Sequence, residues 1–193
     1  MSISIFPTLI HYAPLGTTKL IKELKKEAYQ IRDYDKEGQK WCKTNYPGGY
    51  TSYQTLSSLH TFSSTFETLE KSIRKAVKSF SKKLQYDMRD KEFFMTDCWV
   101  NIMPKSVTHP MHLHPLSTIS GTYYVSTPKG TSSITFEDPR LPFYMAQPPR
   151  PFRYSITPKA GNLVLFESWL RHEVAANQAK EDRISISFNY HWR

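Results

Sequence analysis

A chain of 193 residues, 39% hydrophobic and 14% aromatic, can bury one sizeable core, and its two cysteines, Cys42 and Cys98, are too few for a disulfide framework. No apolar run approaches the length of a membrane span and the first residues lack a leader pattern, so we expect a soluble, cytoplasmic, single-domain protein without a membrane partner. The net charge of +9 is compatible with anionic small molecules, acidic substrates or nucleic acid as partners. No nucleic-acid-binding motif accompanies the charge, so a solvated basic face is the simpler interpretation. Nucleic acid therefore stays an open but unfavoured partner.

Two amphipathic helices are predicted in the first half of the chain. From Thr17 to about Tyr34, apolar residues recur at helical spacing among lysines and glutamates. A second helix is predicted to begin at Ser64, and Glu67 three residues later indicates a capping box. Between the two helices, Pro47-Gly48-Gly49 predicts a turn.

After residue 84 the sequence changes to short alternating runs rich in aromatic and β-branched residues, which are typical of strands. The predicted strands are Phe93–Met103, Ile119–Ser126, Ser132–Phe136, Phe152–Thr157, Asn162–Phe166 and Ile184–Trp192. Such strands, with no helices between them, favour an antiparallel sandwich or jelly roll over a parallel sheet. We therefore expect a mainly β domain over 1–193, with a helical support region at 1–90 and the β core at 91–193. The Pro-rich stretch 138–151 reads as a stiff connection, either a spacer or a lid.

Three histidines carry the strongest chemical signal. His112 and His114 are two residues apart, which along a strand sends both rings to the same face, and imidazole suits Zn, Cu, Fe and Ni. A solvated His-Pro loop is the alternative, and His172 beside Glu173 could form a surface pair instead. Together in a β-rich chain, the three histidines predict a metal site, with His109 ranked below them as an alternate ligand.

The last predicted strand alternates apolar and polar residues from Arg183 to Trp192. In an ordinary two-layer sheet the polar face meets water. In a jelly roll with a ligand cavity the same face can look inward, and Arg183 and Ser185 would then offer a guanidinium and a hydroxyl group to one carboxylate.

These motifs, in this order, resemble the small 2-oxoglutarate and Fe(II) dependent oxygenases, which are related at longer range to prolyl hydroxylases. The resemblance covers nearly the whole chain and includes Gly49-Tyr50-Thr51-Ser52-Tyr53, Trp99-Val100-Asn101, His112-Leu113-His114-Pro115, Tyr123-Tyr124-Val125, Gly161-Asn162-Leu163, His172-Glu173-Val174 and Arg183-Ile184-Ser185. It implies a cupin-like double-stranded β-helix and a dioxygenase. Such an enzyme would use O2 to hydroxylate an unactivated C–H bond of a small-molecule or peptide substrate, and would release succinate and CO2.

The resemblance also implies roles for individual residues. The implied Fe(II) ligands are His112, His114 and His172, and the residues implied to bind the distal carboxylate of 2-oxoglutarate are Arg183, Ser185 and Tyr124. Tyr123 points the other way along its strand and belongs in the core. Asn101 shares a strand face with Trp99 and could reach the co-substrate or the substrate, although a structural hydrogen bond explains it equally well.

One position departs from the family pattern. The usual motif is H-x-D or H-x-E followed by a distant histidine, whereas His114 stands in the place of the carboxylate. An all-imidazole site leaves the metal its full double charge, so 2-oxoglutarate would be the main anion that neutralises it. The alternatives are a non-oxygenase metal-binding cupin and a ligand-binding jelly roll without catalysis. The sequence does not decide between a monomer and a homodimer.

Overall fold

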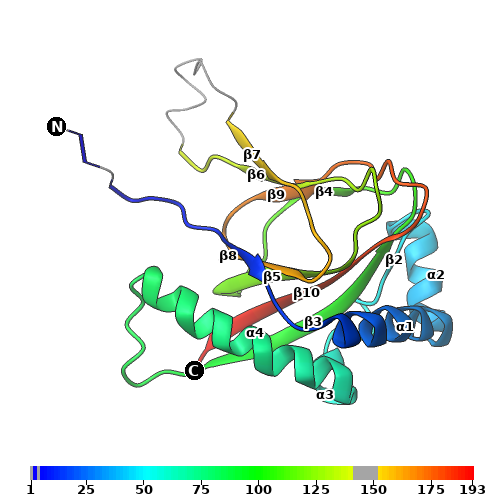
Figure 1. The fold of residues 1–193 in the computed structure, drawn as a ribbon, viewed down its shortest axis with the longest axis horizontal. Coiled ribbons are helices and arrows are strands. Elements are labelled where there is room, and N and C mark those ends of the chain that lie inside the picture. Colours follow the sequence, from blue (N-terminus) through cyan, green and yellow to red (C-terminus); the bar gives the residue numbers. More distant parts are fainter. Residues whose placement is uncertain (1, 4, 141–151) are drawn as a thin grey trace.

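The computed structural model describes residues 2–3, 5–140 and 152–193, which form two antiparallel β-sheets with helices against the larger sheet (Figure 1). The helices are α1 (Thr18–Tyr34), α2 (Lys36–Asn45), α3 (Leu59–Phe62) and α4 (Ser64–Lys83). The strands are β1 (His11–Pro14), β2 (Tyr50–Thr51), β3 (Phe93–Met103), β4 (His109–His112), β5 (Ile119–Ser126), β6 (Ile134–Glu137), β7 (Arg153–Ile156), β8 (Asn162–Glu167), β9 (His172–Val174) and β10 (Arg183–Trp192). The predicted mainly β fold with N-terminal helices is confirmed.

The two sheets form a double-stranded β-helix. The larger has the order β1-β8-β5-β10-β3-β2 and the smaller the order β4-β9-β6-β7. Helices α1 and α4 lie along the outer face of the larger sheet, and the smaller sheet lies on its other side (Figure 1). The chain crosses repeatedly between the sheets, so residues distant in sequence meet in the space that the sheets enclose.

Strand β10 is buried on both faces. It lies between β5 and β3, and its apolar residues Ile184, Ile186 and Phe188 are 0% exposed on the face that the helices cover. Its polar residues Arg183 and Ser185, on the other face, are each only 2% exposed. The polar face therefore looks inward between the sheets, as expected for a jelly roll with a ligand cavity and not for a two-layer sheet that meets water.

The second long helix begins where the sequence predicts but is capped differently. Its N-cap is Ser63, whose Oγ accepts hydrogen bonds from two backbone N–H groups of the first turn. The predicted capping box of Ser64 and Glu67 is therefore wrong. Glu67 instead forms an ion pair with Lys71 one turn along the helix, at 2.6 Å.

Several short elements were not predicted, namely α2, α3, β1, β2, β4 and β9. Two of them, β1 and β2, pair into the larger sheet although they precede residue 90, and the domain division at that residue stays a prediction. Within the part of the chain described here, no helix combines the length and the apolar character needed to cross a membrane. The interpretation of 138–151 as spacer or lid falls mostly on 141–151, outside the described residues.

Close packing of β5 against its neighbours depends on Gly121. A Cβ atom at this position would lie 2.4 Å from the backbone oxygen of Val164 on β8 and 2.5 Å from Cζ of Phe188 on β10. A Cβ atom cannot approach other heavy atoms this closely, so a side chain here would push the central strands apart.

We expect Gly121→Ala to lower the free energy of unfolding by about 1–3 kcal/mol, because the methyl group overpacks the sheet centre. Ser126→Ala is the matched control, since it removes an atom from the end of the same strand. Urea denaturation of both variants followed by circular dichroism measures the difference. Equal stability of the two variants would contradict the packing that we describe.

Candidate active site

A cavity of about 320 Å³ opens between the two sheets. Its walls combine the polar faces of β3, β5 and β10 with the histidines near β4 and β9. The lining residues are Trp41, Asn45, Tyr46, Thr51, Tyr53, Trp99, Asn101, His109, Pro110, His112, Leu113, His114, Pro115, Thr122, Ile134, His172, Val174, Arg183, Ser185, Ser187 and Asn189. Six of the seven residues for which the sequence predicts a site role therefore line one cavity. The seventh, Tyr124, is buried against Arg183.

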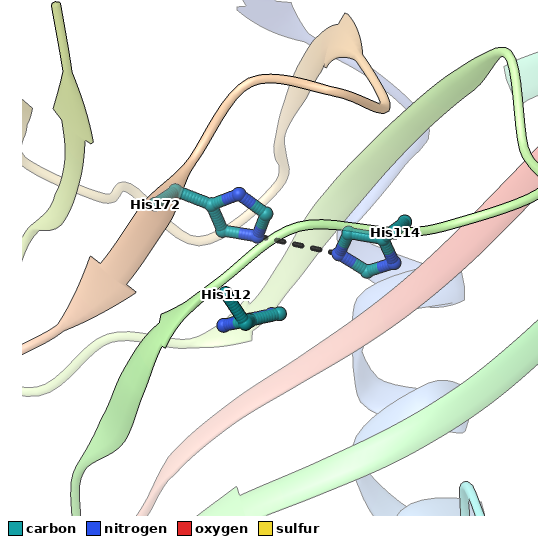
Figure 2. A group of neighbouring side chains, drawn as sticks. All are labelled: His112, His114 and His172. Carbon is teal, nitrogen blue, oxygen red and sulfur yellow. Dashed lines mark hydrogen bonds between the residues drawn. The ribbon is translucent and has the colours of Figure 1, made fainter.

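The three predicted metal-binding histidines form one cluster (Figure 2). His112 ends β4 and lies opposite His172 at the start of β9. His114 lies beyond the strand, in a short loop held by a hydrogen bond of 3.0 Å from its backbone N–H to the oxygen of Ser168. The Nε2 atoms of His114 and His172 are 3.3 Å apart, and the candidate ligand atoms of all three rings lie within 4.8 Å of one another.

Backbone carbonyl groups orient two of the rings. Nδ1 of His112 lies 2.7 Å from the oxygen of Pro110, and Nδ1 of His172 lies 2.9 Å from the oxygen of Leu170. A carbonyl oxygen can only accept, so each Nδ1 carries the proton and each Nε2 keeps a free lone pair. Such hydrogen bonds fix the ring orientation of metal-binding histidines.

Burial disfavours the charged form of two of the three histidines. It lowers the pKa of His172 to about 3 and that of His114 to about 4, and the neighbouring His112 lowers both further. A hydrogen bond to the side chain of Asn189 partly opposes this effect at His114. Neutral imidazoles are the form that binds a metal ion.

This donor set fits a first-row transition metal such as Fe(II). Two nitrogens that each lie about 2.1 Å from one ion can be no more than about 4.2 Å apart, so the rings need to move by less than about 1 Å to share an ion. Among the residues described, no carboxylate belongs to the cluster. Glu137 is not in it, and its carboxylate accepts a hydrogen bond from Arg171.

Arg183 is a buried cation for which the structure shows no carboxylate partner within the described ranges. Its Nη1 donates to Oγ of Ser185 and to Sδ of Met103, both at 3.2 Å, and its guanidinium lies over the ring of Tyr124 at 5.2 Å. Two buried polar atoms here have no hydrogen-bond partner, the Nε of Arg183 and the hydroxyl oxygen of Tyr124. Burial raises the pKa of Tyr124 to about 12, so this hydroxyl group is a protonated donor.

Asn101 forms a structural hydrogen bond, which was one of the two roles that the sequence left open for it. Its Nδ2 donates to Oγ of Ser187 at 3.0 Å, while its Oδ1 has no partner. His109, the lower-ranked ligand, lies outside the three-histidine group and stacks on Tyr46 with ring centroids 4.9 Å apart.

Sequence reasoning missed Tyr46 as a site residue. Its ring lines the cavity and its buried hydroxyl group has no partner among the described residues. Gly49 makes room for the ring, because a Cβ atom there would lie 2.5 Å from Cε1 of Tyr46. The Gly-Gly turn after an aromatic residue was therefore the one available signal.

Comparison with known families finds a match that covers most of the strands. Residues 97–189 match the model of the family described as "Putative 2OG-Fe(II) oxygenase". This segment, which holds most of the strands of both sheets, is therefore similar to the 2OG-Fe(II) oxygenases. That family is one of oxidoreductases that use Fe(II) and 2-oxoglutarate, and the matched segment contains all three clustered histidines and Arg183.

Solved structures agree with this assignment at the level of the fold. A prolyl-4-hydroxylase from Pseudomonas putida has a TM-score of 0.65 and 14% identity over 95% of this chain and 92% of that one. The epimerase SnoN in complex with Fe3+, alpha ketoglutarate and nogalamycin RO has a TM-score of 0.71 and 14% identity over 95% and 78%. HygX from Streptomyces hygroscopicus with nickel and 2-oxoglutarate has a TM-score of 0.65 and 12% identity over 95% and 82%. None of the curated proteins matches the sequence.

If the histidine cluster binds Fe(II), the ion should stabilise the fold, by about 2.7 kcal/mol at 100 times its dissociation constant. We expect His114→Ala to weaken this binding at least about 10-fold, because it removes one of three ligands. Anaerobic thermal unfolding at increasing Fe(II) concentration measures the effect. His191→Ala, which removes an imidazole outside the cavity, should respond to Fe(II) as the wild type does. An equal loss of Fe(II)-dependent stabilisation in both variants would argue against Fe(II) binding by the three histidines.

Proposed function

We propose that this protein is a 2-oxoglutarate and Fe(II) dependent dioxygenase that hydroxylates an unactivated C–H bond of a small-molecule or peptide substrate. In this proposal His112, His114 and His172 hold the iron, and Arg183 binds the distal carboxylate of 2-oxoglutarate. The observation that carries it is the buried guanidinium of Arg183, which lacks a carboxylate partner within the described chain and lines the same cavity as the three clustered histidines.

Electrostatics explain why this arrangement calls for an anion. An unpaired buried charge costs several kcal/mol, and a carboxylate that meets the guanidinium through charge-assisted hydrogen bonds offsets that cost. Ser185 already lies 3.2 Å from Nη1, and the unpartnered hydroxyl group of Tyr124 is a second neutral donor beside the same guanidinium. These three residues therefore make a binding site for one carboxylate group.

The two ends of a dicarboxylate have different partners in this cavity. Arg183 lies on the larger sheet and the histidines lie on and beside the smaller one, so a ligand held by both must span the space between the sheets. 2-Oxoglutarate has a carboxylate for Arg183 at one end and a 2-oxo acid group at the other that can bind a metal. This bridging fixes the orientation of the co-substrate before any reaction takes place.

The protein contributes positioning and exclusion of water. Fe(II), when bound with 2-oxoglutarate and O2, supplies the oxidising chemistry, in which one oxygen atom enters the C–H bond of the substrate and the other enters succinate as CO2 leaves. Carbonyl oxygens hold the Nδ1 atoms of His112 and His172, which orients both rings. Free, buried Cys42 and Cys98 agree with a reducing compartment, and we propose the cytoplasm.

The first test is the binding of 2-oxoglutarate to anaerobic, Fe(II)-loaded protein by isothermal titration calorimetry. We expect Arg183→Ala to weaken binding at least about 100-fold, because it removes the cation that pairs with the carboxylate. Arg89→Ala, at an exposed arginine, is the matched control. Unchanged affinity in Arg183→Ala would refute the co-substrate assignment, and a metal-binding protein that ignores 2-oxoglutarate would be a non-oxygenase cupin.

A pair of adjacent tyrosines on β5 provides a second test. The hydroxyl group of Tyr124 lacks a partner near Arg183, whereas that of Tyr123 points toward the helices and donates to the oxygen of Leu15 at 3.0 Å. We expect Tyr124→Phe to weaken 2-oxoglutarate binding about 10-fold through loss of one hydrogen bond to a charged acceptor. Tyr123→Phe should reduce stability and leave the affinity unchanged. The reverse pattern in calorimetry and urea denaturation would exclude Tyr124 from the carboxylate site.

A further inference from the structure

An aromatic wall runs from the histidine cluster to the mouth of the cavity. The ring of Trp99 lies 5.9 Å from that of His114, and the ring of Tyr53 lies 4.8 Å from that of Trp99. Trp99 is 6% exposed and Tyr53 is 49% exposed, so the series of rings leads outward from the cluster to solvent. Trp41 and Leu113 also line the cavity, and Leu113 is partly exposed at its edge.

Charge is nearly absent from the same cavity. Of the described residues that line it, Arg183 alone carries a permanent charge, and no aspartate, glutamate or lysine is among them. The remaining polar groups at the walls are mainly amides, hydroxyl groups and imidazoles, and burial lowers the pKa of His114 and His172 to about 4 and about 3. Most of the lysines that contribute to the chain's charge of +9 lie on helices α1, α2 and α4 instead.

These two properties restrict what can bind there. A phosphate, carboxylate or ammonium group that entered beside 2-oxoglutarate would lose its hydration and find the opposite charges already engaged, since 2-oxoglutarate pairs with Arg183 at one end and with the metal ion at the other. A flat apolar group would instead cover the rings of Tyr53 and Trp99 and displace water from them. The cavity of about 320 Å³ is at the small end of ligand sites and has to hold the co-substrate as well.

We propose that the substrate of this site presents an uncharged aromatic or heteroaromatic ring, which lies against Tyr53 and Trp99 with its reactive carbon toward the histidine cluster. This inference rests on the proposed function, because it assigns Arg183 to 2-oxoglutarate. In this proposal, the part of the substrate that enters the cavity is neither the charged end of a free amino acid nor a phosphate group. The basic charge of the helices does not change this, because none of the helix lysines that the structure describes lines the cavity.

The test compares three probes of similar shape: neutral indole, anionic indole-3-acetate and cationic tryptamine. Each is added to protein loaded with Zn(II), a redox-inactive ion, and 2-oxoglutarate, and binding is measured by saturation-transfer NMR. We expect indole to bind at least about 10-fold more tightly than either charged probe. Equal or tighter binding of a charged probe, or no transfer to indole, would overturn the inference.

The same spectra separate this inference from the proposed function. Transfer to the methylene protons of 2-oxoglutarate reports the co-substrate directly, and its absence from the wild type would refute the proposed function itself. With the co-substrate bound, failure of indole alone refutes only the neutral-ring substrate.

Two variants locate the binding surface. Tyr53→Ala should weaken indole binding about 5-fold while leaving 2-oxoglutarate bound, because it removes the outer ring of the wall. Tyr34→Ala, at a tyrosine of α1 that is 82% exposed and does not line the cavity, is the matched control. If Tyr53→Ala binds indole as the control does, the aromatic wall is not the binding surface.

A charge placed at the mouth tests selectivity. Asn45 is exposed at the end of α2 and lines the cavity, so Asn45→Lys adds a cation there without disturbing the core. We expect this variant to bind indole-3-acetate several-fold more tightly than the wild type while tryptamine stays weak. No gain for the anion would show that charge does not select the ligand.

Discussion

The molecule depends on one strand that is buried on both sides. In most sheets a polar face meets water, but β10 places Arg183 and Ser185 inside the protein, opposite an apolar face covered by helices. Helices α1 and α4 make this possible, because they shield the apolar side and leave the polar side to face the smaller sheet. The cavity and its cation are therefore consequences of how β10 is enclosed.

The buried guanidinium of Arg183 needs hydrogen-bond partners from the groups around it. Met103 and Ser185 accept from a single nitrogen, the ring of Tyr124 covers one face, and the rest of the hydrogen-bonding capacity is unfilled by the described residues. A protein built for stability alone would gain by replacing such a group with an apolar one. Its retention in the interior is what distinguishes a ligand site from a structural core.

Long periodic elements could be predicted from the sequence, and short ones could not. The boundaries of β3 and β5 match the predicted strands, because eight or more residues of β-rich sequence leave little ambiguity. Strands β2 and β9 have two and three residues, and they exist only because distant partners pair with them. Helix α2 was not predicted because it has few apolar residues and contains Gly38. The helix is stabilised at its start by Asp35, whose side chain accepts a hydrogen bond from the backbone N–H of Gly38.

The site was predictable in its residue types but not in its geometry. An H-x-H spacing on a strand predicts two rings on one face, yet β4 ends at His112, and His114 reaches the cluster from a loop whose backbone bonds to Ser168. The aromatic wall was hidden for a related reason. Tyr53 and Trp99 are 46 positions apart, and only the pairing of β2 with β3 brings them together.

The position of Asp97 bears on the missing carboxylate ligand. Asn189 donates from Nδ2 to Oδ2 of Asp97 at 3.1 Å, and the side chain of Asn189 also forms a hydrogen bond with His114. The hydrogen bond from Asn189 and the negative charge of Asp97 both act to raise the pKa of His114, and so partly offset the lowering by burial. The negative charge that H-x-D would place on the metal thus lies one amide further out, behind the histidine. An imidazole in this position keeps an anionic group nearby, while Arg183 stays the one permanently charged side chain among the described residues that line the cavity.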